Sequence, residues 1–301
     1  MGDANSATHP GKEHFPREHE FSVRLPVLAR SNGVDRARPL ESSHNVSAGS
    51  GPWHDFGLSD IWDQMLNRFR CRQREPELMD QPGLEDHLHR GALVGLGRIN
   101  RFSGSGRIVW NAVERLISAN APRTWRLLDL ASGGGDVAID VARRAARAGA
   151  RVVVDGYDVS PFAVRYATAR ATERGVENVQ FFRQDVLNGP LPEGYDVVMC
   201  SLFLHHLPEE IASALLARMA AAAQRLVLVN DLCRSAFGYG LVWLGCRFLT
   251  RSPIVHVDGP RSVQSAFSLN EIREVARQGG LAGAIVERRW PCRFLLQWSR
   301  D

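Results

Sequence analysis

The chain has 301 residues, of which 44% are hydrophobic and 23% are charged. These proportions exclude a fully disordered or collagen-like protein, and the length suits two domains or one elaborated α/β domain. The 37 basic residues exceed the 33 acidic ones by four, and Lys12 is the only lysine. Because the arginines are interleaved with acids rather than gathered in runs, we expect no nucleic-acid partner.

The cysteines are far apart in the sequence and show no CxxC or Cys/His ligand spacing: Cys71, Cys200, Cys233, Cys246 and Cys292. We therefore expect reduced thiols, no disulfide framework and no metal site. The first twenty residues lack the apolar region of a secretory signal. The most apolar stretch, 237–249, is too short to span a bilayer and contains Arg247. These features predict a cytoplasmic protein without stable membrane insertion.

Residues 1–55 are rich in Ser, Gly, Pro, His and Arg and show no sustained period, which predicts a disordered or weakly ordered tail. The composition changes after this tail. Apolar residues recur at helical spacing within 61–69, 84–96 and 108–117. We therefore expect an N-terminal helical cap over residues 56–122.

Strands and helices alternate from residue 123 onward. Apolar runs bounded by turn residues predict strands at 127–131, 152–158, 179–184, 195–203 and 226–230. Helices of ten to fifteen residues separate them, as in a parallel, doubly wound sheet. Two of these helix starts carry capping signals: Ser160 before Pro161, and Ser268 with Glu271 three residues later.

The last two predicted strands, at 284–289 and 294–298, are joined by a turn at Pro291. Such a hairpin would close the sheet with antiparallel strands. The predicted fold is thus an α/β, doubly wound, seven-stranded sheet, mostly parallel, with helices on both faces. It occupies residues 123–301, and residues 234–262 form an insertion that would cover an acceptor.

Carboxylates follow three of the predicted strands, where open α/β sheets bind their ligands. Asp129 precedes a glycine-rich loop, and Asp158 and Asp185 end the second and third strands. The pattern Gly133-x-Gly135-x-x-Ala138 also satisfies a permissive dinucleotide-binding motif. However, three acids would repel a pyrophosphate and suit a cationic ligand rich in donors. S-adenosylmethionine, which carries a sulfonium, an ammonium and a ribose diol, fits this description.

Four segments together resemble the class I S-adenosylmethionine-dependent methyltransferases: residues 127–135, 156–161, 183–186 and 195–207. The similarity covers roughly residues 126–298. It is closest to the small-molecule group typified by the ubiquinone and menaquinone biosynthesis methyltransferases. This resemblance implies a Rossmann-like fold and S-adenosyl-L-methionine as the cofactor.

The resemblance also implies a role for each matching position. Gly133 and Gly135 would line the methionine end, Asp129 would orient that loop, Asp158 would bind the ribose hydroxyls, Val159 would pack on adenine, Asp185 and Val186 would meet the adenine edge, and Ser201 would lie beside the amino acid moiety. Ala131 stands where the family often has glycine. Its methyl group would therefore crowd the amino acid end slightly.

Three histidines are candidate catalytic residues. Methyl transfer from a sulfonium is an in-line displacement that depends mainly on alignment, but a phenol or enol acceptor also needs a base. His205 and His206 follow the fourth strand, and His256 lies in the insertion. The aromatic stretch 235–249 either lines an acceptor pocket or is an ordinary core helix. We expect a small aromatic, quinone or polyketide-like acceptor, with O-methylation favoured over C-methylation.

Other functions remain open at this point. A nucleic-acid or protein methyltransferase is one, although the fourth strand lacks the Asn/Asp-Pro-Pro-aromatic loop of base amino-methylation. An NAD-type oxidoreductase and a non-catalytic binding module are the others. The sequence leaves the oligomeric state undetermined, with a homodimer as one possibility.

Overall fold

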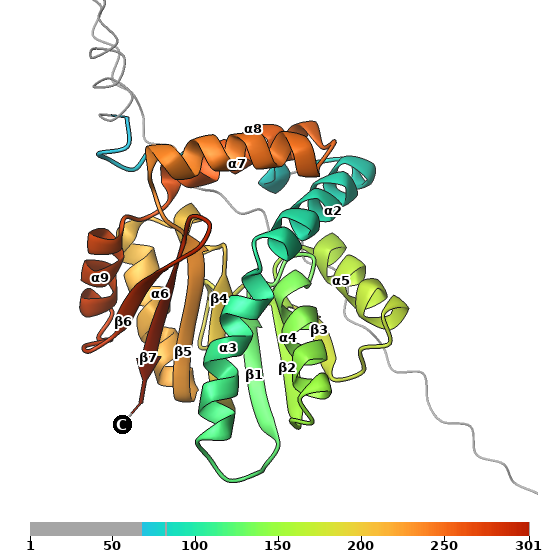
Figure 1. Ribbon diagram of the computed structural model, residues 1–301, viewed down its shortest axis with the longest axis vertical. Coiled ribbons are helices and arrows are strands. Elements are labelled where there is room, and N and C mark those ends of the chain that lie inside the picture. The colour runs from blue at the N-terminus through green and yellow to red at the C-terminus, as the bar shows by residue number, and fades with distance from the viewer. Residues whose placement is uncertain (1–67, 82, 301) are drawn as a thin grey trace, which may run out of the picture. The chain divides into compact units, whose positions relative to one another are not determined.

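The computed structural model describes residues 68–81 and 83–300 (Figure 1). The predicted tail at 1–55 and most of the predicted helix at 61–69 lie outside these residues. A seven-stranded sheet with the order β3-β2-β1-β4-β5-β7-β6 organises the described part of the chain. The predicted α/β fold is therefore confirmed.

Five strands of the sheet pair in parallel, and the last two strands form an antiparallel hairpin. The parallel strands are β1 (Trp125–Leu130), β2 (Val152–Asp158), β3 (Val179–Arg183), β4 (Tyr195–Ser201) and β5 (Ala223–Leu232). The hairpin of β6 (Ile285–Arg289) and β7 (Arg293–Ser299) joins through β7, which pairs antiparallel with β5. Because β1 and β4 are central, their side chains are buried on both faces, as the continuous apolar runs predicted.

Helices cover both faces of this sheet. On one face, α3 (Ser105–Ser118), α4 (Asp136–Arg147) and α5 (Pro161–Glu173) share a core with β1 and β2. On the other face, α6 (Glu209–Ala222) and α9 (Leu269–Gln278) share a core with β4 and β5. Helix α3 was expected in the cap. Its apolar stripe (Val109, Ala112, Val113) instead packs in the α4 core with at most 3% exposure, so α3 is part of the sandwich.

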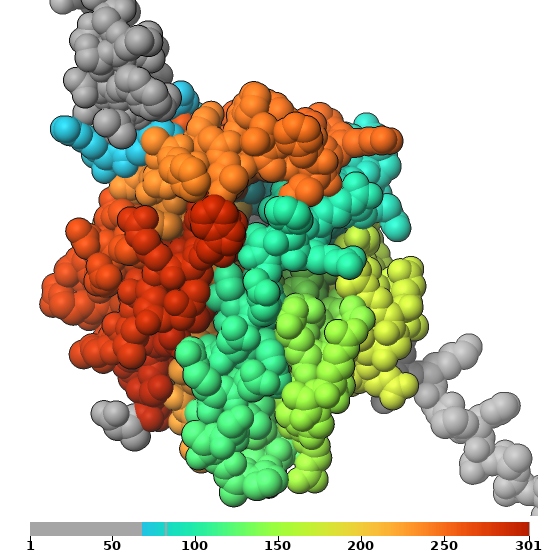
Figure 2. Space-filling model, in the orientation of Figure 1, coloured from blue at the N-terminus to red at the C-terminus, as the bar shows by residue number. Residues whose placement is uncertain are grey.

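Three further helices form a layer at the carboxyl ends of the parallel strands (Figures 1 and 2). These are α2 (Asp86–Phe102), α7 (Ala236–Leu249) and α8 (Pro253–Ser265), with the short 3₁₀ helix η1 (Leu78–Asp80) beside them. A small apolar core of Ala92, Cys246, Ile254 and Val255 joins them. We call this layer the cap.

Most aromatic residues of α7 lie on the surface, whereas the sequence left a pocket lining and an ordinary core helix as the two alternatives. Phe237, Trp243 and Phe248 are 66%, 42% and 79% exposed, whereas Tyr239 packs against Phe69. Since three of the four aromatic rings face outward, α7 contributes a single aromatic ring to the inside of the cap.

The capping signals of the sequence are confirmed in detail. The Ser160 hydroxyl accepts a hydrogen bond from the Ala163 amide at the start of α5. Ser268 and Glu271 form a reciprocal capping box on α9. Across residues 68–81 and 83–300, no helix combines the length and the hydropathy needed to span a membrane.

Candidate active site

The glycine-rich loop after β1 is held by Asp158, which ends β2. One Asp158 oxygen accepts from the Gly133 amide at 2.7 Å, and the other accepts from the Ser160 amide at 2.9 Å. Gly133 has a φ of +52°, and an added Cβ would find no atom within 4 Å. By contrast, a Cβ at Gly135 would lie 2.6 Å from the Phe181 ring. The loop is thus packed tightly at Gly135 and leaves open space for a ligand at Gly133.

Asp129 lies beneath this loop and is only 2% exposed. Its Oδ1 has no hydrogen-bond partner among the described residues. Burial and the nearby charge of Asp158 raise the pKa of Asp129 to about 8. Burial also raises the pKa of Asp158, in spite of its two amide donors. Asp158 accepts the hydrogen bond from the loop, whereas the family resemblance implied that Asp129 orients it.

Four polar side chains form a row on one face of the sheet at its carboxyl edge. They are Asp129 on β1, Ser201 on β4, Asn230 on β5 and Arg293 on β7. Each has at least one buried polar atom without a partner in the described part of the chain. Buried polar groups are almost always hydrogen-bonded, so the row has the donors and acceptors to hold a polar ligand. We call these four residues the polar row.

The remaining predicted cofactor residues lie at the ends of β2 and β3. Val159 is 60% exposed and Val186 is buried. The carboxylate of Asp185 accepts from the Leu187 amide at 2.8 Å and from the Asn188 side chain. Asp185 therefore shapes its own turn, and a contact with adenine remains a prediction.

The backbone is strained where two central strands end. Ala131, directly after β1, has a φ of +52°, and Leu202, directly after β4, has a φ of +57°. This left-handed region favours glycine, because a Cβ crowds the following carbonyl there. The conformation gives a physical reason why a glycine would suit position 131.

His205 lies in the 3₁₀ helix η2 (Leu204–His206), between two acids. Its Nδ1 lies 2.7 Å from Asp231 Oδ1, and its Nε2 lies 3.5 Å from Glu77 Oε1. Burial alone would lower the pKa of His205, but the charges of Asp231 and Glu77 outweigh burial and raise it to about 10. His205 is therefore an imidazolium at neutral pH.

His206 has the opposite character. Burial and the adjacent charge of His205 lower the pKa of His206. Its Nδ1 lies 3.4 Å from Asp80 Oδ2, and its Nε2 lies 3.9 Å from Glu77 Oε1. With 24% of its side chain exposed, His206 is the neutral and more accessible imidazole of the pair.

Sequence reasoning missed Glu77, Asp80 and Asp231, which complete this cluster. The cap fixes Glu77 and its neighbours, because Asp258 accepts the Leu78 and Met79 amides at 2.9 and 3.0 Å. Asp231 is the second-last residue of β5 and directly follows the strand predicted at 226–230, so inspection of that strand end, as for the first four strands, could have found it. Nothing in the sequence near Glu77 relates it to His205, which lies 128 positions later.

The donor atoms of Glu77, His205 and His206 lie within 4.8 Å of one another, a spacing that a divalent cation could use. A cation would have to displace the proton of His205, whose pKa is about 10. A cation and this proton would therefore compete for the cluster, and the competition would depend on pH.

His256 is not part of this cluster. It lies on α8, where its Nε2 donates to the Thr250 carbonyl at 2.9 Å. This bond ties the start of α8 to the turn before it and occupies one ring nitrogen. The structure thus brings together two of the three predicted histidines.

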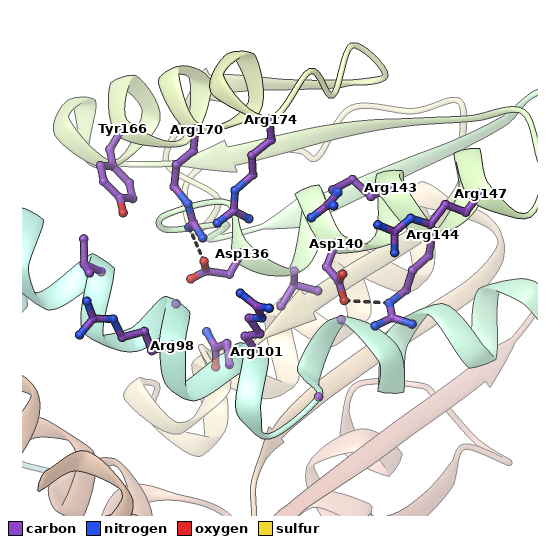
Figure 3. Close-up of a pocket in the computed structure, with 16 residues that line it drawn as sticks. Arg98, Arg101, Asp136, Asp140, Arg143, Arg144, Arg147, Tyr166, Arg170 and Arg174 are labelled. Atoms are coloured by element: carbon purple, nitrogen blue, oxygen red, sulfur yellow. Dashed lines mark hydrogen bonds and ion pairs between the residues drawn. The ribbon is translucent and has the colours of Figure 1, made fainter. Parts of the chain in front are cut away.

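A separate cavity of about 710 Å³ lies against α4, between α2, α3 and α5 (Figure 3). Seven arginines line it: Arg98, Arg101, Arg143, Arg144, Arg147, Arg170 and Arg174. Asp136 pairs with Arg170, and Asp140 pairs with Arg144. None of the predicted site residues lines this cavity. Arginines that are scattered in the sequence therefore gather on one side of α4.

A family model and two known proteins that match this chain are all methyltransferases. A family described as "Methyltransferase domain" matches residues 127–225. The chain is 35% identical over 150 residues to a demethylmenaquinone methyltransferase of Thermus thermophilus, covering 49% of this chain and 64% of the relative. It is 28% identical over 164 residues to a ubiquinone biosynthesis O-methyltransferase of Aeromonas salmonicida, covering 54% and 63%. In both cases less than two thirds of the relative's length is spanned.

Solved structures share the fold. The S-adenosylmethionine-dependent methyltransferase SibL superposes with a TM-score of 0.52 at 19% identity, covering 83% of this chain and 71% of that one. The DszA carbon methyltransferase gives 0.51 at 13% identity, with coverages of 68% and 57%. At these identities the likeness concerns the fold alone.

Proposed function

We propose that this chain is a class I S-adenosylmethionine-dependent methyltransferase, distantly similar to menaquinone and ubiquinone biosynthesis methyltransferases, and that it methylates a small aromatic acceptor. The acceptor class is a quinol, phenol or polyketide-like aromatic compound, and the methyl group goes to oxygen. When bound, S-adenosylmethionine supplies the methyl group as an electrophile on its sulfonium. The protein aligns the acceptor and takes up its proton.

The observation that carries this proposal is the unequal pair of histidines at the end of β4. His205 already holds a proton between Asp231 and Glu77, so it cannot accept another. His206 is neutral and partly accessible. We assign His206 as the base that accepts the proton of an acceptor hydroxyl, and His205 as the residue that positions it.

Two acids beside the glycine-rich loop, Asp129 and Asp158, support the cofactor assignment. No arginine or lysine of the described chain forms an ion pair with Asp129 or Asp158, and the pKa of each is raised by burial. A sulfonium and an ammonium would supply the missing positive charge. The cofactor contacts that we propose are Asp129, Ala131, Gly133, Gly135, Asp158, Val159, Asp185, Val186 and Ser201.

The cap supports an apolar acceptor. Helix α8 packs against η2, which carries His205 and His206, and the core of the cap is apolar. The two relatives, a demethylmenaquinone methyltransferase and a ubiquinone biosynthesis O-methyltransferase, are both named for quinones. An aromatic ring with one ionisable hydroxyl would bury its apolar part under the cap and present the hydroxyl to His206.

The experiment is an acceptor screen with isotopically labelled S-adenosylmethionine over phenols, quinols and acyl-derived aromatics. The position of the label in each product, read by mass spectrometry and NMR, separates O- from C-methylation. We expect labelled O-methyl products from at least one of these classes. Label in nucleic acid or protein only, or binding of a nicotinamide cofactor instead of S-adenosylhomocysteine, would overturn the proposal.

Histidine variants test the assignment of the base once an acceptor is found. We expect His206→Gln to lower kcat by about 10²- to 10⁴-fold while leaving S-adenosylhomocysteine affinity unchanged. His256→Gln should retain most activity, because His256 is bonded to Thr250. His87, exposed at the start of α2, offers a matched control as His87→Gln. Equal losses for His206→Gln and His256→Gln would refute this assignment.

A further inference from the structure

Arg293, the first residue of β7, has a buried guanidinium with unused donors. It is 3% exposed, and its Nη2 donates to Asn100 Oδ1 at 3.2 Å and to Ser103 Oγ at 2.9 Å. Its Nε and Nη1 have no partner among the described residues. Because an unpaired buried charge is costly, a guanidinium in this state calls for an anion.

The strand alternation places Arg293 in the polar row. Leu295, two residues later on β7, belongs to the α3–α4 core, so Arg293 faces the same side of the sheet. Arg293 is registered with Leu232 of β5, and Asn230, two residues before Leu232, faces this side too. Asn230 is registered with Ser201 of β4. Arg293 therefore lies at the β7 end of the polar row, in which each side chain has at least one buried polar atom without a partner among the described residues.

Asn100 connects Arg293 to the glycine-rich loop. It accepts from Arg293 and also hydrogen-bonds Asp136, the first residue of α4. Asp136 directly follows Gly135. The guanidinium is thus linked through one side chain to the end of the loop that would receive the amino acid end of the cofactor.

We propose that Arg293 binds the carboxylate of the methionine moiety of S-adenosylmethionine. The inference rests on the proposed function and extends it, because no contact for this carboxylate has been assigned so far. The polar row then matches the ligand in charge. Asp129 lies at the end that would face the cationic groups, and Arg293 lies at the end that would face the single anionic group. Charge-assisted hydrogen bonds of this kind are the strong ones.

The test compares two ligands that differ in one carboxylate. Calorimetry measures the binding of S-adenosylhomocysteine and of its decarboxylated analogue, S-adenosyl-3-thiopropylamine, to the wild-type protein and to Arg293→Gln. We expect the wild type to prefer S-adenosylhomocysteine by about ten- to a hundredfold. The preference should fall to less than about threefold in Arg293→Gln, with the affinity for the analogue nearly unchanged.

Two further variants control for structural effects. Arg293→Lys keeps the charge and should keep part of the preference, so it provides the same comparison if Arg293→Gln unfolds in a thermal melt. Arg288→Gln removes an exposed arginine from the neighbouring strand and should keep the full preference.

Distinct results would overturn the proposal. A preference that persists in both Arg293 variants would show that the carboxylate binds elsewhere. An unchanged preference combined with a raised KM for the acceptor would assign Arg293 to the acceptor instead. If the wild type binds neither ligand, the proposed function fails together with this inference.

Discussion

The candidate site has two halves, one around the glycine-rich loop (Asp129 and Asp158) and one around the histidine pair (Glu77 and Asp231), and the pKa values of these carboxyls are shifted in opposite directions. In the glycine-loop half, the pKa of Asp129 is raised to about 8, and that of Asp158 is raised as well. In the histidine half, the pKa values of Glu77 and Asp231 are lowered. Exposure does not explain the difference, since Asp129 and Asp231 are 2% and 1% exposed.

A neighbouring cation explains it. Burial raises the pKa of a carboxyl in both halves, but hydrogen bonding to His205 and the charge of the histidine pair outweigh burial at Glu77, and the charge of His205 with its hydrogen bond outweighs burial at Asp231. Asp129 has only the charge of another acid nearby. The histidine half thus contains its own counter-charge and can be used for proton transfer. The glycine-loop half has a surplus of acid that a cationic ligand would balance.

We expect the largest effect from Asp231→Asn, which removes the negative charge next to His205. The substitution keeps the shape of the side chain but leaves the His205 imidazolium without its closest buried partner. Removal of one member of a buried ion pair costs about 3–5 kcal/mol, so we expect a loss of that order in the free energy of unfolding. Urea denaturation at pH 7 measures it.

The control for this experiment is Glu287→Gln on β6, which removes a partly exposed partner of Arg289. It should change stability by less than about 1 kcal/mol. If both variants lost the same amount, His205 would not depend on Asp231 as described.

The pH dependence of stability tests the raised pKa of Asp129 in the glycine-loop half. Its pKa is about 8 in the folded protein, against 3.8 for an ordinary aspartate. Between these values the unfolded chain has lost the proton that the folded chain retains, so stability falls as pH rises towards 8. Each pH unit corresponds to at most about 1.4 kcal/mol.

Asp129→Asn removes this titration. Denaturation curves between pH 6 and 8 should therefore show a steeper loss of stability in the wild type than in the variant. Parallel pH profiles for the two proteins would mean that Asp129 is ionised in the fold.

A smaller effect is expected at Ala131, whose φ of +52° follows β1. Glycine adopts this conformation without the Cβ clash, which amounts to about 1 kcal/mol or somewhat more. Since the unfolded chain gains entropy with glycine, we expect Ala131→Gly to be stabilising by up to about 1 kcal/mol. The buried helical position Ala142 gives the opposite reference, because Ala142→Gly should destabilise. If thermal melts showed both variants to be less stable than the wild type, the proposed backbone strain at Ala131 would be contradicted.

The sequence was sufficient where the physical signal is local. The strand and helix alternation, the Ser160 cap and the Ser268 capping box depend on residues within a few positions of one another, and all are observed. The position of α3 was not predictable in this way. An amphipathic stripe shows that a helix packs, but not whether it packs on the sheet or in the cap.

The residues of the candidate site also differ in whether local sequence signals could identify them. Asp158 and Gly133 follow neighbouring predicted strands and were both assigned to the cofactor through the family resemblance, and a hydrogen bond joins them. Glu77 and Arg293 were missed, because their partners lie far away in the chain. Their significance comes from burial and pairing, which only the folded arrangement reveals.

The most direct measurement is calorimetric titration of S-adenosylmethionine in two buffers of different ionisation enthalpy, which counts the protons released on binding. We predict saturable binding at one site, with release of up to one proton from Asp129 at pH 7 and a smaller release in Asp129→Asn. Absence of binding would contradict the cofactor assignment. Binding with the same proton release in both proteins would contradict the claim that the cofactor balances the buried acid.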